Sequence, residues 1–389
     1  MGTVTPQPGW KRFSCAAAFL LAIGSGCGGG NNGPSAPGTG GTGGGAGSTV
    51  TQTCSEQPVF AARGFGENDV DVIRQIRVDD ATGDLYFSIL DQLFVIRSGA
   101  GMPEKIADYG DEFWLTPDAI LIPWGSRMGD QVPVLLTTGR AGGTASVVVT
   151  TPASTSFNDI FEVADVVVVG DEVTWIARNL HTDHPEQLLA PFDKTYFVRK
   201  TSWRSPGPPQ QLYQGTRDLQ GIVVAGGKLY VSEEIGEVDS NDYQQKIIDF
   251  ATGAVDPTNP FDKYRGEVVA GDDVSLIVSR DLDLDHPETA GVFRVAPDGS
   301  GEARLLQFPV FLRSAFDIAS RDGTWVFTSK KDLVSPITVY SYSVTDGIRQ
   351  IGCATGEDTT DHAIALGSSQ TFLSIFRNGN SATILKYAQ

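Results

Sequence analysis

Apolar and polar positions repeat one pattern from residue 73 to the end of the chain. An apolar run is followed by a Gly, Asp or Asn turn, and then by a second run rich in β-branched and aromatic residues. This pattern is typical of β-hairpins, and helical periodicity is nearly absent. In the clearest copy, Ile73 to Ile89, Gly83 suits a left-handed turn position between two strands. The pattern predicts an all-β protein.

The hairpin recurs seven times, about every 48 residues, and a third or fourth strand-like run usually follows. Such units predict a seven-bladed β-propeller, with six or eight blades as alternatives. In the weakest copy we expect Asp118 to Pro123 to be the first strand and the run around Leu135 to be the second. The strand-like segment at residues 57–65 should complete the seventh blade, which would otherwise have an open edge. The segment VDDATGDLYFS, from Val78 to Ser88, resembles a strand-turn-strand phrase of bacterial secreted propeller-repeat proteins, which implies the same fold.

The N-terminus has the order of an export signal. Lys11 and Arg12 precede the apolar run from Cys15 to Ile23, which is shorter than the roughly 20 residues that span a bilayer. Small residues and Cys27 follow, and this order resembles the signal peptides of bacterial lipoproteins. The resemblance implies removal of residues 1–26, acylation of Cys27, and anchoring in the bacterial cell envelope, at the outer membrane. Secretion is the alternative if Cys27 is not acylated.

The remaining chain divides by composition. Residues 27–51 begin at Cys27 and are dominated by Gly, which predicts a flexible tether, and residues 52–389 form a single propeller domain. Cys54 and Cys353 are the two cysteines left for the folded part. In an oxidising envelope they predict a disulfide that joins its two ends, and two unpaired buried thiols are the alternative.

One phrase occurs twice: ARNLHTDHPE begins at Ala177 and SRDLDLDHPE at Ser279. Each copy follows a predicted second strand and precedes a third, in blades 3 and 5. In a propeller, the loops between second and third strands lie on the same face as the connections between blades, and we call this the loop face. We expect all four histidines there. The structural alternative is a turn that was copied when one blade duplicated.

The loop face should combine imidazoles with carboxylates. The candidate metal-binding or ligand-binding residues are His181, His184, Glu186, Asp239, Asp242, Asp283, Asp285, His286, Glu288, Asp361 and His362. We place Asp118, Asp218 and Asp317 on the same face. Imidazole with carboxylate suits Zn²⁺ or Mn²⁺, whereas alternating acids at positions 281, 283 and 285 suit Ca²⁺. A divalent cation is therefore a candidate cofactor.

The net charge of −18 and the lack of a basic run argue against nucleic-acid binding. The chain has no Gly-x-Ser-x-Gly, His-Glu-x-x-His or phosphate-loop motif. We expect a binding or scaffold module that meets a protein or glycan partner at its loop face, and the membrane only through its lipid. The alternative is a metal-dependent lyase or hydrolase that uses His184, His286 and His362 at the channel mouth, so whether the protein is an enzyme stays open.

Overall fold

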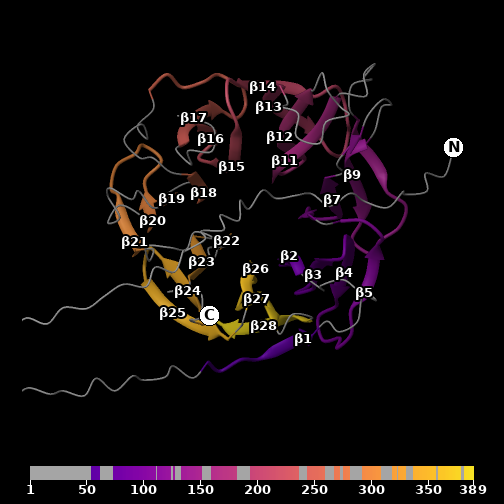
Figure 1. Cartoon of the computed structure of the whole chain (residues 1–389), viewed down its shortest axis with the longest axis vertical. Helices are drawn as coiled ribbons and strands as arrows, with labels where there is room; N and C mark the ends of the chain where they lie inside the picture. The colour runs from indigo at the N-terminus through magenta and orange to yellow at the C-terminus, as the bar shows by residue number, and fades with distance from the viewer. Residues whose placement is uncertain are drawn as a thin grey trace, which may run out of the picture. The chain divides into compact units, whose positions relative to one another are not determined.

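The hairpins form seven small antiparallel sheets arranged in a ring in the computed structural model (Figure 1). The structure describes residues 54–61, 73–110, 112–123, 126–127, 133–150, 159–181, 193–235, 243–258, 267–271, 275–280, 291–307, 318–321, 323–329, 336–355, 358–377 and 381–389. These residues belong to one compact unit, Gln52–Gln389. Among them no helix is long and apolar enough to cross a membrane. The prediction of an all-β, seven-bladed propeller is confirmed.

Each sheet is one blade, and its strands follow one another outward from the axis of the ring. Blade 1 contains β2 (Ile73–Val78), β3 (Leu85–Ile89), β4 (Gln92–Ile96) and β5 (Glu104–Ala107). Blade 2 contains β6 (Trp114–Leu115), β7 (Ala119–Pro123), β9 (Pro133–Gly139) and β10 (Ser146–Thr150). Blade 3 contains β11 (Asp159–Val169), β12 (Glu172–His181), β13 (Asp193–Ser202) and β14 (Gln210–Gly215), with β8 (Ser126–Arg127) added along the inner edge of β11.

The other four blades follow the same plan. Blade 4 contains β15 (Leu219–Ala225), β16 (Lys228–Glu234) and β17 (Tyr243–Asp249). Blade 5 contains β18 (Glu267–Gly271), β19 (Leu276–Arg280), β20 (Gly291–Val295) and β21 (Ala303–Gln307). Blade 6 contains β22 (Ile318–Arg321), β23 (Thr324–Ser329), β24 (Ile337–Ser343) and β25 (Gly347–Ala354). Blade 7 contains β26 (Asp358–Leu366), β27 (Gln370–Arg377) and β28 (Ser381–Ala388), and β1 (Pro58–Ala61) is its outer strand.

The hydrophobic core lies between neighbouring blades. In β3, Leu85 and Phe87 pack toward blade 7, whereas Tyr86 packs toward Ile120 of blade 2. A second strand is therefore apolar on both faces, which explains why these strands are continuous apolar runs in the sequence. Each of the other interfaces between blades has its own cluster of this kind.

The expected strand order of blade 2 was wrong. Residues 118–123 were expected to supply its first strand, but β7 is the second strand, and β9, which contains Leu135, is the third. The first strand is β6, which has two residues and pairs Trp114 with Leu121. A strand of two residues has no alternation of apolar and polar positions to recognise. The hairpin that was expected to contain the first and second strands of the blade therefore contains its second and third strands.

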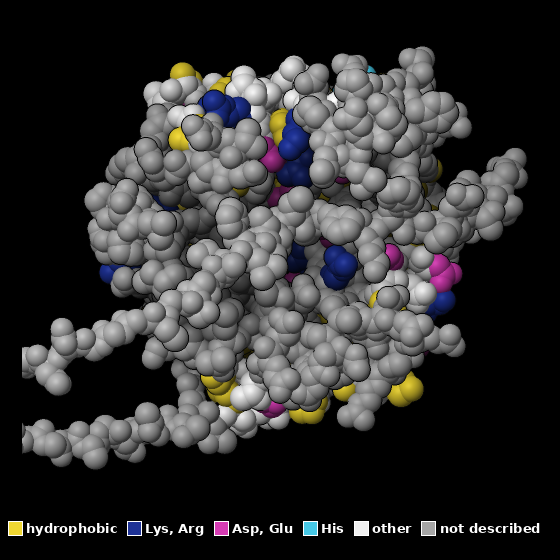
Figure 2. All heavy atoms as spheres, in the orientation of Figure 1, with side chains coloured by type: hydrophobic (Ala, Val, Ile, Leu, Met, Phe, Trp, Pro, Cys, Tyr) yellow, Lys and Arg dark blue, Asp and Glu magenta, His cyan; other side chains and the backbone are white. Residues whose placement is uncertain are grey.

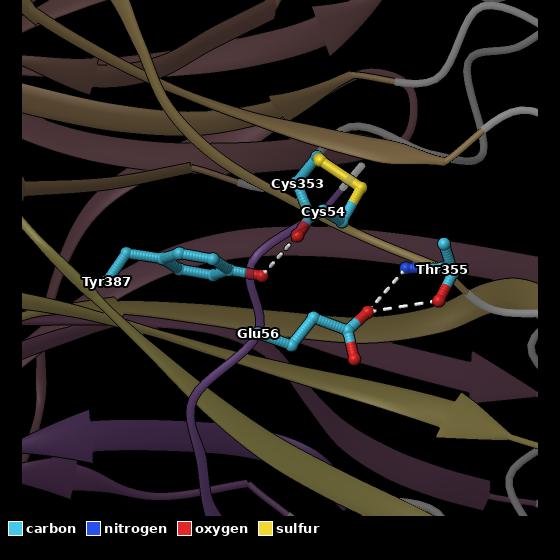
Figure 3. Close-up of a disulfide and its surroundings, with 5 residues drawn as sticks. All are labelled: Cys54, Glu56, Cys353, Thr355 and Tyr387. Atoms are coloured by element: carbon cyan, nitrogen blue, oxygen red, sulfur yellow. Dashed lines mark hydrogen bonds between the residues drawn. A yellow bond between two sulfur atoms is a disulfide. The ribbon is translucent and has the colours of Figure 1, made fainter. Parts of the chain in front are cut away.

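Residues near the N-terminus close the ring, as predicted. Strand β1 pairs with β28 of the C-terminal blade, with Phe60 opposite Ile384. The predicted disulfide is present between Cys54, which precedes β1, and Cys353 of β25, with Cα atoms 5.2 Å apart (Figure 3). Because β25 is the outer strand of blade 6, the disulfide connects blade 6 to the outer strand of blade 7.

Polar contacts around the disulfide tie the same segments together (Figure 3). The Tyr387 hydroxyl donates a hydrogen bond of 2.8 Å to the carbonyl of Cys353. The Glu56 carboxylate accepts hydrogen bonds from the backbone N–H (2.8 Å) and the hydroxyl (3.0 Å) of Thr355. The Tyr387 ring lies against Gly352, where a Cβ would be 2.3 Å from a ring carbon. Blades 6 and 7 therefore share covalent, polar and packing contacts.

Candidate functional site

A cavity of ≈ 320 Å³ lies in the centre of the ring, where the innermost strands of blades 1 to 5 meet. It is lined by Arg74, Gln75, Arg77, Glu112, Trp114, Ala164, Asp165, Val166, Ile222 and Val269. Four of these side chains are ionisable, and they come from blades 1 to 3. Basic and acidic side chains are visible near the middle of the face drawn in Figure 2. The cavity is thus a polar site at the centre of a hydrophobic ring.

A β-bulge in the first strand explains how arginines reach this cavity. The pairing of β2 with β3 shifts register between Ile73 and Gln75, so Arg74 is an extra residue. In a regular strand, Ile73 and Ile76 would face opposite sides, but both are buried in the cluster between blades 1 and 7. The bulge leaves Arg74 at the inner edge of the blade, where it lines the cavity.

The same bulge occurs in β11, β15 and β18, where register shifts leave out Ala164, Gly221 and Val269. We call these residues and Arg74 the bulge positions. Gly221 has a φ of 59°, a left-handed conformation that glycine adopts without steric cost. The bulge is thus a repeated device that turns one residue of an inner strand toward the channel.

Asp165 supports the wall between blades 3 and 4. One of its carboxylate oxygens accepts the N–H of Val166 at 2.8 Å, and the other accepts the N–H of Ile222 at 2.9 Å. On the blade 1 side, Gln75 Oε1 accepts the N–H of Phe113 at 2.6 Å. These bonds satisfy backbone amides near the bulges of β11 and β15 and just before β6. The cavity wall is therefore held by hydrogen bonds between blades.

The repeated phrase begins within the second strand and not, as expected, in the loop that follows it. Residues 177–181 belong to β12 and residues 279–280 to β19, and the rest of each copy stands in the chain between the second and third strands of its blade, outside the described residues. The described part of each copy contains one arginine at the same position. Arg178 forms an ion pair with Asp218 (3.3 Å), ahead of the first strand of blade 4, and Arg280 forms one with Glu302 (2.8 Å), within blade 5. These arginines join strands and blades.

Aromatic rings support both arginines. The Arg178 guanidinium lies 6.0 Å from the centre of the Tyr196 ring, and that of Arg280 lies 4.2 Å from the centre of the Phe293 ring. Burial, and to a lesser extent the charge of Asp218, raise the pKa of Tyr196, so the phenol stays neutral. The start of the repeated phrase therefore has a structural role in both blades.

Glu233 lies near the end of β16, the second strand of blade 4, where it pairs with Leu219 of β15. Its carboxylate is buried and accepts hydrogen bonds from Thr216 N (2.7 Å) and the Tyr213 hydroxyl (2.9 Å), while Lys246 Nζ lies 3.2 Å away. Burial acts to raise the pKa of Glu233, but the hydrogen bonds and Lys246 outweigh it, so the pKa lies below its usual value. Glu233 therefore fixes the connection between blades 3 and 4.

Most of the predicted metal or ligand residues lie outside the described part of the chain. They are His184, Glu186, Asp239, Asp242, Asp283, Asp285, His286 and Glu288. Asp317 also lies outside it. His181 is the last residue of β12 and is partly buried. Asp361 and His362 lie in β26, where His362 is opposite Ile375, but their side chains are not described. Among the described residues, no group of three or more His, Cys, Asp or Glu is arranged to hold a metal ion.

The structure places one predicted loop-face residue on the opposite face. Asp118 lies in the turn between β6 and β7, the first and second strands of blade 2, and such turns are on the face away from the loop face. Arg204 forms ion pairs there with Asp118 (3.0 Å) and with Asp171 (2.7 Å), which lies in the corresponding turn of blade 3. The error follows from the strand assignment in blade 2. Asp218, in contrast, does precede the first strand of blade 4.

Sequence reasoning missed the residues of the central cavity. Apolar residues in IRQIRV stand at Ile73, Ile76 and Val78, with a spacing of three and then two. This break in the alternation is the signature of a bulge, and it marks Arg74.

Comparisons with known proteins support the fold and go no further. The sequence matches no protein-family profile and no curated protein. The structure is similar to an oligogalacturonate lyase in complex with manganese, with a TM-score of 0.55 and 11% identity over 87% of this chain and 94% of the lyase. It is also similar to an acylaminoacyl peptidase, with a TM-score of 0.56 and 10% identity over 81% of this chain. A puromycin-hydrolyzing peptidase of Mycobacterium tuberculosis gives a TM-score of 0.55 and 13% identity over 83% of this chain.

The match covers 52% and 53% of the two peptidases, so this chain spans about half their length. At these identities the similarity establishes a β-propeller fold alone.

Proposed function

We propose that this chain is an exported propeller of the bacterial envelope that binds a small polar ligand in its central cavity. The observation that carries the proposal is the cavity itself: ionisable side chains from three blades line a space of ≈ 320 Å³. A space of this size is at the lower end of the range for small-molecule sites. Blade packing rests on apolar surfaces, as the clusters between blades illustrate, so it does not by itself explain why two arginines of blade 1 line the centre. The loop face around the channel is the surface we assign to a protein or glycan partner.

Blocking the cavity with a larger side chain tests this proposal. Purified protein is screened against a panel of small polar compounds by thermal shift, and hits are measured by calorimetry. Replacing Ala164, which lines the cavity, by Phe should abolish binding of the hits. The matched control is Ala251→Phe, because Ala251 is exposed in a turn of blade 4. Circular dichroism checks that both variants fold. Hits that bind equally to the Ala164→Phe variant would refute the assignment to the cavity.

We also propose that the domain is anchored through an acylated Cys27. Two or more acyl chains give stable anchoring, whereas one chain binds membranes only marginally. Cys27→Ala should therefore release the protein from the membrane fraction into the soluble fraction. Unchanged sedimentation of this variant with membranes would exclude the lipid anchor.

A metal-dependent lyase or hydrolase at the channel mouth is a second candidate, with His184, His286 and His362 as ligands or bases. The similarity in fold to a lyase solved with manganese favours it. Elemental analysis after dialysis tests it, because a catalytic site of this kind should retain about one Zn²⁺, Mn²⁺ or Ca²⁺ per chain. Protein without bound metal would leave the repeated phrase as a duplicated turn.

A further inference from the structure

We infer that the central cavity selects a small hydroxylated carboxylate, and that Arg74 and Arg77 bind its carboxylate group. This inference rests on the proposed function, because it names the class of ligand for the same cavity. Both arginines come from β2 and both line the cavity.

The four bulge positions provide an internal control for Arg74. The same backbone device carries Ala164 in β11, Gly221 in β15 and Val269 in β18. A small or apolar residue therefore satisfies the fold at this position. Ala164 and Val269 line the same cavity as Arg74, so their surroundings are comparable. The fold does not require an arginine at this position in blade 1, which supports a role for Arg74 in binding.

Charges are distributed unevenly around the cavity. The two guanidinium groups belong to blade 1, whereas the carboxylates of Glu112 and Asp165 belong to blades 2 and 3. A guanidinium has five N–H donors in a planar fork, so it can bind a carboxylate while it keeps a protein partner. Carboxylates of the protein only accept hydrogen bonds, so the part of the ligand that meets them must donate, as hydroxyl groups do.

The two protein carboxylates also limit the charge of the ligand. For a doubly charged group both the repulsion by the two carboxylates and the attraction by the two arginines double, so the second charge brings no clear electrostatic gain. The cost of removing the ion from water grows with the square of its charge, so a singly charged carboxylate gains the arginine contacts at a lower cost than a phosphate dianion. The cavity therefore favours a hydroxy acid over a phosphate ester.

Three six-carbon probes separate these requirements. Gluconate has the carboxylate and the hydroxyls, sorbitol has only the hydroxyls, and hexanoate has only the carboxylate. Calorimetry or ligand-observed NMR on the full chain should show the tightest binding for gluconate and weaker binding for hexanoate and sorbitol. Arg74→Ala should weaken gluconate binding about tenfold, the loss expected for one charge-assisted contact, and leave sorbitol binding unchanged. Arg74→Lys should fall between wild type and Arg74→Ala, because it keeps the charge and loses the fork.

The matched control is Arg349→Ala, which removes the same charge from an exposed position on β25, an outer strand. It should bind gluconate as the wild type does. Equal binding of gluconate and sorbitol, together with no effect of Arg74→Ala, would overturn the inference and leave the cavity as a site for neutral ligands. Binding of inorganic phosphate but of no carboxylate would overturn the choice of anion. Failure of all four probes to bind would also overturn it, whereas the Ala164→Phe experiment tests the cavity with other compounds.

Discussion

Two junctions between neighbouring blades of the ring are held together by different chemistry. At the junction of blades 6 and 7, the Cys54–Cys353 disulfide joins β25 to the segment before β1, and β1 belongs to blade 7 only by its pairing with β28. At the junction of blades 3 and 4, the chain is continuous, and the buried Glu233 carboxylate binds the connecting segment through Thr216. The first junction needs a covalent bond because β1 is four residues long and an exposed end can peel away. The second needs only hydrogen bonds, because the segment that Glu233 binds is itself the covalent connection between blades 3 and 4.

Of the two junctions, the one with the disulfide should show the larger loss of stability on mutation. Removing it in the Cys54→Ala/Cys353→Ala variant should lower the free energy of unfolding by up to about 5 kcal/mol, because the closed loop is very long. Denaturant unfolding measures this loss, and hydrogen exchange should locate it first in β1 and β28. Tyr387→Phe serves as the control at the same junction, because it removes one hydrogen bond, worth about 1 kcal/mol, and leaves the disulfide intact. A double alanine variant as stable as the wild type would contradict the closing role of the disulfide.

Glu233 should give the next largest effect. Glu233→Gln should cost about 2 kcal/mol at neutral pH, because it leaves Lys246 and the donors around Thr216 without their charged acceptor. The pKa of Glu233 is lowered in the folded protein, so its contribution is complete above the unfolded pKa, near 4.3, and is lost as the pH falls through the folded pKa. The difference between variant and wild type should therefore shrink in acid.

Unfolding curves at pH 7 and pH 4 test this dependence. The control is Glu104→Gln, because Glu104 is 65% exposed and its ion pair with Arg97 is 3.6 Å long, so the expected change is below about 1 kcal/mol. A constant difference at all pH values would mean that the charge of Glu233 does not matter for the junction.

The fold could be predicted from sequence because its signals are local. The sequence shows apolar second strands, Gly turns and two cysteines in the folded part. These features predict the ring of blades and the disulfide that closes it. The first strand of blade 2 could not be found, because two residues such as Trp114 and Leu115 carry no period. The same lack of local signal hid Glu233, whose partner Thr216 lies in the preceding connection.

The central cavity could be predicted only in part. The irregular spacing in IRQIRV indicates a bulge at Arg74, but the neighbours of that residue come from blades 2 to 5 and are defined only once the ring closes. The histidines could be recognised in the sequence, but their role could not be derived from the structure. His181 lies in β12 and His362 in β26, the other two lie outside the described residues, and a role at a metal site stays a prediction that the elemental analysis addresses.

The smallest expected effect concerns the arginines of the repeated phrase, and it separates contacts across a junction from contacts within a blade. Double-mutant cycles on Arg178–Asp218 and Arg280–Glu302 should each give a coupling energy of about 0.5–1 kcal/mol, since both pairs are partly exposed. Hydrogen exchange should then differ, because Arg178 meets the segment that leads into β15 and Arg280 meets its own blade. Arg178→Ala should increase exchange at the start of β15, whereas Arg280→Ala should increase it in β21 and leave β15 unchanged. Equal exchange patterns in the two variants would mean that the ion pair between blades 3 and 4 does not couple them, and that the contacts of Glu233 and Asp165 hold the junction without it.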